Sequence, residues 1–144
     1  MADETLWPPI NEENAPFWEG TRQGELRMQR CPDTQRFIFP PRLTSPWSNG
    51  AIPEWHGVSG RGRIWSFVVP HPPLLPPFDA WAPYNVILVS LDEDPAIRLV
   101  GNLIANEGAQ VDSIDPSQIE LDAPVRVVFE RLSDEIYLPR WVLD

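Results

Sequence analysis

Proline dominates this sequence: 18 of its 144 residues are proline, and they are spread along the whole chain. Proline fixes φ and has no N–H to donate, so it interrupts helices and the inner strands of sheets. Long helices are therefore not expected. The sequence predicts one small domain, or a small barrel with an appendage, built from short strands and irregular loops. A hydrophobic share of 42% is enough for a real core.

The charge is strongly acidic. The formal net charge is −10, and all 11 basic residues are arginine, with no lysine. The chain therefore cannot supply a Schiff-base lysine or the lysine of a phosphate-binding loop. Nucleic-acid binding needs basic groups to neutralise phosphates, so the charge also opposes that function.

The only cysteine is Cys31, so no disulfide can form within the chain, and a reducing compartment is expected. The N-terminus has no basic segment followed by an apolar stretch, and no apolar run approaches the ~20 residues of a membrane span. We expect a cytoplasmic protein with no membrane association.

The first part of the chain predicts a small appendage. Residues 1–14 form a polar arm, and 15–24 predict a short helix with Asn14 as its cap and Gly24 as its stop. Strands are expected at 26–30 and 37–39, each followed by a turn-rich segment. The appendage, 15–57, has too little apolar content for a core of its own.

The second part, 58–144, predicts a barrel. Five strands are expected, at 63–69, 85–91, 98–104, 125–131 and 137–143. In the first, Trp65, Phe67 and Val69 share one face, and in the fourth, Val125, Val127 and Phe129 do. The second is apolar on both faces, as in a strand covered on both sides.

The connections support the same barrel. Residues 71–83 hold five prolines and cannot pair as a regular central strand. Asp115 precedes a proline and predicts one capped helical turn over 115–118. Short strands, turns and one helical turn favour a mainly β fold: a five-stranded Greek-key barrel of OB type behind a short helix.

Four positions in the appendage have the spacing of a zinc ribbon, C-x2-C-x10-C-x2-C. Their occupants are Cys31, Thr34, Ser45 and Ser48. Hydroxyl groups stay protonated near neutral pH and are poor zinc ligands, so we expect no zinc and no other cofactor. From spacing alone, a chance match in a proline-rich loop is the favoured interpretation.

The order of several short segments resembles the DUF35 family of OB-fold proteins with an N-terminal rubredoxin-like zinc ribbon. We call the turn with Cys31 and Thr34 the first knuckle and the turn with Ser45 and Ser48 the second. The opening helix and the first knuckle resemble the family at 17–20, 24–26 and 29–31, and the segment before the second knuckle does so at 39–42. The barrel strands are similar at 59–67, 83–91, 101–104, 125–130 and 138–140. The chain departs from the family at the three missing cysteines.

The resemblance implies a degenerate, metal-free ribbon, held by Phe37, Phe39 and Trp47 in place of metal. It also implies a role beside a larger enzyme that acts on acyl-CoA in lipid or steroid metabolism. Such partners are thiolase-like, lipid-transfer-type, hydratase or aldolase proteins. The chain would be a non-catalytic accessory subunit, in a hetero- or homo-oligomer, that contacts the CoA thioester.

Four residues are candidates for CoA contact. Arg61 and Arg63 alternate with glycines, so a basic turn could grip phosphates through guanidinium pairs. The alternative, solvated arginines at the start of a strand, is the favoured one. His71 and Tyr84 complete the set, although a structural histidine is the better interpretation of His71.

Three tryptophans, Trp47, Trp55 and Trp81, fall in expected loops. They predict either interface anchors or covers for the ends of the barrel. Two competing functions remain. A single-strand nucleic-acid binder would use the OB fold against the acidic charge. A stand-alone enzyme would use His71, for which the sequence offers no catalytic partner.

Overall fold

The computed structural model describes residues 7–144, and they form two compact units. The N-terminal unit comprises 7–60 together with 131–138, and the barrel unit comprises 61–130 together with 139–144. The chain therefore passes between the units shortly after the predicted boundary at residue 58. Residues 1–6 of the predicted arm lie outside the described residues.

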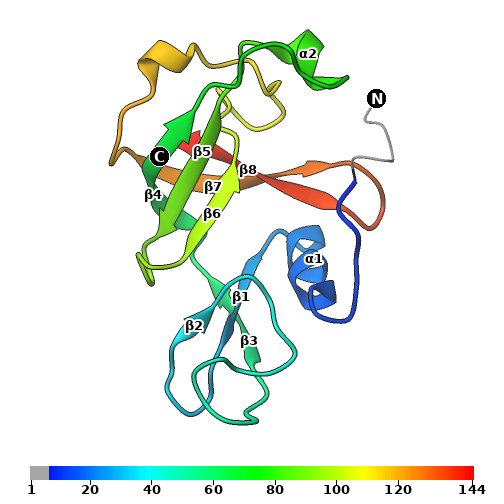
Figure 1. Ribbon diagram of the computed structural model, residues 1–144, viewed down its shortest axis with the longest axis vertical. Helices are drawn as coiled ribbons and strands as arrows, with labels where there is room; N and C mark the ends of the chain where they lie inside the picture. The colour runs from blue at the N-terminus through cyan, green and yellow to red at the C-terminus, as the bar shows by residue number, and fades with distance from the viewer. Residues whose placement is uncertain (1–6) are drawn as a thin grey trace. The chain divides into compact units, whose positions relative to one another are not determined.

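The N-terminal unit contains one helix and a three-stranded sheet. Helix α1 is Ala15–Arg22, and the strands are β1 (Leu26–Arg30), β2 (Phe37–Ile38) and β3 (Glu54–Val58). The strands are antiparallel in the order β2-β1-β3 (Figure 1). Phe17 and Trp18 of the helix are buried, as are Leu26 and Met28 of β1, which supply this unit's apolar interior.

The ends of α1 differ from the prediction in two ways. The helix ends at Arg22, two residues before Gly24, whose φ of 79° glycine adopts without steric cost. Asn14 stands at the N-cap, but its Oδ1 accepts the N–H of Asn11 at 2.8 Å instead of a helix N–H. The predicted cap interaction is therefore wrong.

The strands of this unit were predicted unevenly. Strand β1 has the predicted bounds, and β2 is one residue shorter than 37–39. Strand β3 was not predicted; it pairs with β1 from Leu26–Val58 to Arg30–Glu54. Because β3 buries none of its five residues, its sequence has no apolar alternation to reveal it.

The barrel unit is built on a five-stranded antiparallel sheet. Its strands are β4 (Arg61–Val68), β5 (Val86–Leu91), β6 (Arg98–Gly101), β7 (Pro124–Arg131) and β8 (Tyr137–Leu143). They lie in the order β6-β5-β4-β7-β8, and in Figure 1 β5 passes in front of β7 and β8. Buried Ile64, Ile87, Val89 and Trp141 fill the interior.

The sheet closes on itself through the segment that follows β6. Leu103 forms a parallel bridge with Trp141 of β8. The N–H of Ile104 donates to the Trp141 carbonyl at 2.9 Å, and the Trp141 N–H donates to the Asn102 carbonyl at 3.0 Å. The predicted OB-type barrel is confirmed, with the expected third strand divided into β6 and this closing segment.

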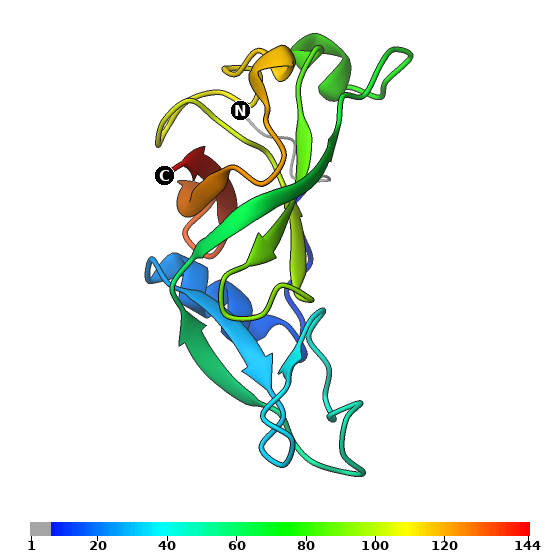
Figure 2. The same ribbon diagram turned by 90° about the vertical axis from the view of Figure 1, so that its left-hand side faces the viewer.

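The predicted face of β4 is wrong. The register against β5 shifts between Ile64 and Ser66, as at a β-bulge. Gly62 and Ile64 face the interior, whereas Trp65 is 52% exposed and Val69 lies beyond the end of the strand. Figure 2 shows β4 as a long, curved strand.

Strand β7 also departs from its predicted alternation. Val125 and Val128 are buried, whereas Val127 and Phe129 are half-buried. In β5, Ile87, Val89 and Leu91 are buried and the alternate residues half-buried, so that strand is covered more fully on one side than predicted.

The connections match their predictions. Residues 71–83 contribute no strand and contain a short helix, α2 (Phe78–Trp81). The 3-10 turn η2 (Pro116–Gln118) begins with Asp115, whose carboxylate accepts the Ser117 N–H at 2.9 Å. Among residues 7–144, no helix is long and apolar enough to cross a membrane.

Candidate functional site

The first knuckle of the ribbon surrounds the Cys31 thiol with hydrogen-bond donors. Cys31 is fully buried. Burial raises the pKa of its thiol, but bonds from the hydroxyls of Ser45 and Thr34, and from the backbone N–H groups of Thr34 and Asp33, lower that pKa to about 7. Cys31, Thr34 and Ser45 therefore meet, as the ribbon spacing predicts, through hydrogen bonds.

The second knuckle is held by hydroxyls as well. The Ser45 hydroxyl accepts the backbone N–H of Trp47 at 3.0 Å. The Ser48 hydroxyl donates to the carboxylate of Asp33, which ties the second knuckle to the first. These bonds involve all four positions that have the spacing of zinc ligands.

The aromatic packing predicted to replace the metal is not what the structure shows. Phe37 is half-buried, Phe39 is 37% exposed and Trp47 is 43% exposed. The Trp47 ring instead lies against the guanidinium of Arg36, 3.4 Å from its centroid. The positions of the predicted ligands are instead joined by hydrogen bonds among the Cys31 thiol and the hydroxyls of Thr34 and Ser45.

The donor set does not fit zinc. A structural zinc site uses four thiolate or imidazole ligands, and three of the four positions here are hydroxyls. Within residues 7–144, no group of three or more His, Cys, Asp or Glu side chains could hold a metal ion.

The candidate phosphate grip at Arg61 and Arg63 is part of strand β4. Arg61 pairs with Asp144 at 2.9 Å, and Arg63 donates to the Asp122 carbonyl at 2.9 Å. Between them, Gly62 is needed for close packing, because a Cβ there would lie 2.3 Å from the Ser90 carbonyl oxygen. The segment is a strand and not a flexible turn.

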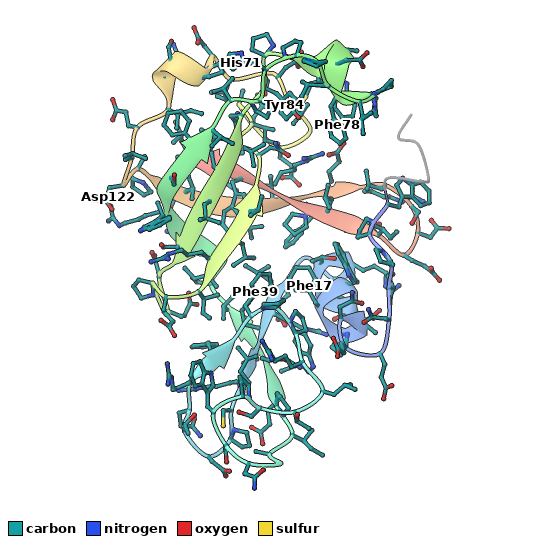
Figure 3. The ribbon with its side chains drawn as sticks, viewed as in Figure 1. Phe17, Phe39, His71, Phe78, Tyr84 and Asp122 are labelled. Carbon is teal, nitrogen blue, oxygen red and sulfur yellow. The ribbon has the colours of Figure 1, made fainter. Side chains whose placement is uncertain are left out.

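His71 and Tyr84 do not join these arginines. Figure 3 shows both at one end of the barrel unit, with Phe78, and apart from Asp122, the residue that contacts Arg63. His71 is exposed, whereas Tyr84 is only 7% exposed and packs 6.1 Å from the Phe78 ring. The four predicted CoA contacts therefore do not form one site.

The three predicted interface tryptophans have different surroundings. Trp47 lies in the second knuckle, as expected. Trp55 is in β3 and Trp81 ends α2, so their assignment to loops is wrong. Trp81 is half-buried against Phe78, with ring centroids 5.5 Å apart.

The sequence missed the most exposed aromatic feature of the barrel unit. The guanidinium of Arg98 lies 3.8 Å from the ring centroid of Trp65, on the outer side of the sheet. Beside it is an open pocket of about 500 Å³ whose lining includes Arg63, Leu121 and Asp122. The sequence feature that could have indicated it is a tryptophan close to an arginine in an expected strand. The bulge that exposes Trp65 cannot be recognised from the sequence of β4.

The same folds appear in proteins already described. Residues 55–130 match the domain family described as "ChsH2, C-terminal OB-fold domain". Residues 18–44 match the domain family described as "ChsH2, rubredoxin-like zinc ribbon domain". A solved chain of the "Ltp2-ChsH2(DUF35) aldolase" is 32% identical, with a TM-score of 0.77, over 95% of this chain and 98% of that one. The chain belongs to the ChsH2 (DUF35) family.

Other family members give the context of these units. The 3-oxo-4,17-pregnadiene-20-carboxyl-CoA hydratase alpha subunit of Mycobacterium tuberculosis is 32% identical over 142 residues, 98% of this chain. A probable enoyl-CoA hydratase alpha subunit of Thermomonospora curvata is 34% identical over 134 residues, 92% of this chain. The chain spans only 39% and 38% of these two relatives.

A more distant structure shares the fold alone. A DUF35-family protein of unknown function from Sulfolobus solfataricus is 13% identical, with a TM-score of 0.60 over 94% of this chain and 87% of that one.

Proposed function

We propose that this ChsH2-family chain is a non-catalytic accessory subunit that binds a larger hydratase or aldolase acting on acyl-CoA substrates of lipid or steroid metabolism. The observation that carries the proposal is the similarity, over nearly the full length of both chains, to a chain of the Ltp2-ChsH2(DUF35) aldolase. The matches to both ChsH2 domains agree with it. The two curated relatives, both hydratase alpha subunits, support the same substrate class.

The chemistry of the side chains supports an accessory role. His71 is exposed and, among the described residues, makes no hydrogen bond or ion pair that would orient it as a general base. Cys31 is fully buried, so a substrate could not reach its thiol without local opening. Neither side chain is placed for nucleophilic or acid–base catalysis.

Contact with CoA stays a prediction for Arg61, Arg63 and His71. Their side chains are exposed, so a phosphate could reach each, but they would have to act at separate places. Tyr84 is only 7% exposed, so it would contact a ligand through a small part of its side chain. We expect any CoA contact to need surfaces of the partner enzyme.

The ribbon carries no zinc in this proposal, because its donors are one thiol and three hydroxyls. Elemental analysis should find no stoichiometric zinc in protein purified without chelator, and a chelator should leave the unfolding midpoint unchanged. One bound zinc per chain would overturn this interpretation. A reducing compartment such as the cytoplasm suits the free thiol of Cys31.

Affinity capture tests the accessory role. The tagged chain is recovered from its native cytosol, and the captured proteins are identified by mass spectrometry and quantified. Recovery of one hydratase, aldolase or thiolase-like enzyme in a fixed ratio, with acyl-CoA activity that depends on this chain, is the expected result. Turnover of acyl-CoA by the chain alone, lost in His71→Ala, would contradict it.

A further inference from the structure

Strands β4, β5 and β6 present an apolar outer face to solvent. Their register aligns Ser66, Leu88 and Val100 in one row, and Val68 with Val86 in the next. These rows alternate with the buried residues of the barrel interior, so their side chains point outward. We define the outer sheet face as this apolar set together with the bulged Trp65. Its members are Trp65, Val68, Val86, Leu88 and Val100.

Three large apolar side chains of this face are exposed to solvent. Trp65 is 52% exposed, Val68 59% and Val100 71%. Single exposed apolar side chains are ordinary on protein surfaces, but a contiguous apolar patch marks a binding surface. Here the strand pairing makes the patch contiguous.

Charge borders the face at one end. The row Arg63, Ser90 and Arg98 lies next to the apolar rows, and the Arg98 guanidinium stacks on Trp65 at 3.8 Å. Among the described residues, Arg98 has no carboxylate in ion-pair distance, although the chain carries a net charge of −10. A basic border is therefore available to a partner's carboxylates.

A hollow next to Trp65 adds shape to the surface. The lining of the pocket of about 500 Å³ includes Trp65, Leu121 and Ser90. The Ser90 hydroxyl is buried there and has no hydrogen-bond partner within the described residues. An inserted side chain with a polar tip would satisfy that hydroxyl, which would otherwise keep its desolvation cost.

We propose that the outer sheet face is the surface by which this chain binds its larger catalytic partner, with Trp65 and Arg98 as the anchor pair. The partner presents an apolar surface bordered by carboxylates, and one of its side chains enters the pocket beside Trp65. This inference rests on the proposed accessory function. Tryptophan and arginine are the residue types most enriched among dominant interface contacts.

Charge selects this occupant over a second copy of the chain. A two-fold dimer through the outer sheet face would set the patch against itself and bring its Arg63 and Arg98 side chains near their counterparts. Like charges at an interface are unfavourable, whereas carboxylates from a different protein complement the arginines.

Single-stranded nucleic acid is the less favoured occupant. OB barrels bind oligonucleotides on an equivalent face, and Trp65 could stack a base. A phosphate backbone, however, requires several cations, and Arg63 already lies 3.7 Å from the carboxylate of Asp122. Arg98 then remains as a single cation, which suits one carboxylate of a protein better than a chain of phosphates.

Affinity measurements with the enzyme recovered by capture test the surface. Trp65→Ala and Arg98→Glu should each raise the Kd of the full chain for that enzyme by about 10-fold or more, since truncating a dominant contact has an effect of this size. Leu75→Ala, at an apolar residue 81% exposed in the same unit, and Arg126→Glu, at an exposed arginine on β7, are matched controls that should change the Kd by less than about 3-fold. Unchanged unfolding midpoints verify that all four variants fold.

The outcomes separate the two proposals. Wild-type chain that recovers no acyl-CoA enzyme overturns the accessory function and this inference with it. Recovery of such an enzyme, with Kd values unaffected by Trp65→Ala and Arg98→Glu, overturns the inference alone. The inference is also overturned if those variants abolish self-association measured by sedimentation, or binding of a labelled oligo-dT measured by anisotropy, and leave the enzyme's Kd unchanged.

Discussion

The side chain of Asn85, the residue before β5, makes hydrogen bonds that a neighbouring strand's backbone would make. It is fully buried, its Nδ2 donates to the Leu103 carbonyl at 2.9 Å, and its Oδ1 accepts the Leu103 N–H at 2.7 Å. Its own carbonyl accepts from the Asn102 side chain at 2.5 Å. The Asn85 side chain therefore bonds both backbone groups of Leu103, as a paired strand would do. Leu103 is also the residue that bridges to Trp141, so this contact lies where the barrel closes.

Asn85→Ala should be strongly destabilising, since it leaves a buried N–H and a buried carbonyl of Leu103 without partners. We expect a loss of about 2–4 kcal/mol in the free energy of unfolding, measured by urea titration. Asn106→Ala, at an exposed asparagine of the same unit, is the control and should change little. A loss below about 0.5 kcal/mol in Asn85→Ala would show that the clamp is unimportant.

Gly62 is a second single residue on which the barrel depends. An added Cβ would lie 2.3 Å from the Ser90 carbonyl oxygen and 2.7 Å from Val89 Cγ1. Gly62→Ala should therefore force β4 away from β5 and lower the free energy of unfolding by about 1–3 kcal/mol. In the control Gly57→Ala, the new Cβ meets only the flexible Glu25 carboxylate, which can move aside, so equal losses in both variants would contradict the clash.

Cys31 should make stability depend on pH. The pKa of its thiol is lowered from 9.0 to about 7 in the folded chain, so the folded state favours the thiolate. Stability from this group is fully present above pH 9.0 and is lost as pH falls toward 7. Urea midpoints should rise across this range in the wild type and rise less in Cys31→Ser. Parallel profiles in the two proteins would rule the effect out.

At the scale of elements, the ribbon keeps the shape of a metal site with different bonds. The Cys31 thiol contacts the side chains of Thr34 and Ser45, so three of the four ligand positions already meet. Ser48 instead pairs with Asp33. Hydrogen bonds of Cys31 to Ser45 and of Ser48 to Asp33 therefore link the two knuckles.

Restoring thiols should restore zinc binding. The triple variant Thr34→Cys, Ser45→Cys, Ser48→Cys has the full C-x2-C-x10-C-x2-C spacing, and thiolates prefer zinc in tetrahedral geometry. We expect about one zinc per chain by elemental analysis after dialysis, and a chelator-sensitive unfolding midpoint. The single variant Thr34→Cys is the control and should retain none. A triple variant that folds without zinc would mean that the knuckles have lost the ribbon geometry.

At the scale of the whole molecule, the chain is an acidic protein with a local basic border beside Trp65. Binding of a partner to the folded state alone stabilises that state by mass action. Partner enzyme at ~100 times its Kd should raise the free energy of unfolding by about 2.7 kcal/mol, measured as a shift of the urea midpoint. A ~10-fold higher Kd in Arg98→Glu should remove about half of this gain at the same concentration, and a larger rise in Kd should remove more. An equal shift in the variant would argue against the outer sheet face.

The sequence alone determined those features that depend on local chemistry. Proline positions excluded long helices, apolar runs located the barrel strands, and Asp115 before Pro116 marked the capped turn. The order of short segments that resembles the DUF35 family predicted the ribbon, which the spacing from Cys31 to Ser48 alone did not, and the three hydroxyls led to the expectation that it holds no metal. Each of these follows from residues close together in the chain or from the identity of a side chain.

Only the tertiary structure decided which faces and which residues meet. The bulge after Ile64 reversed the predicted face of β4 and exposed Trp65. Strand β3 depends on pairing with the edge of β1. Arg98 lies on β6 and Trp65 on β4, and the pairing of both strands with β5 brings the two side chains together on the outer side of the sheet. Register and closure are set by hydrogen bonds between distant segments, and the sequence of each segment carries no record of its partner.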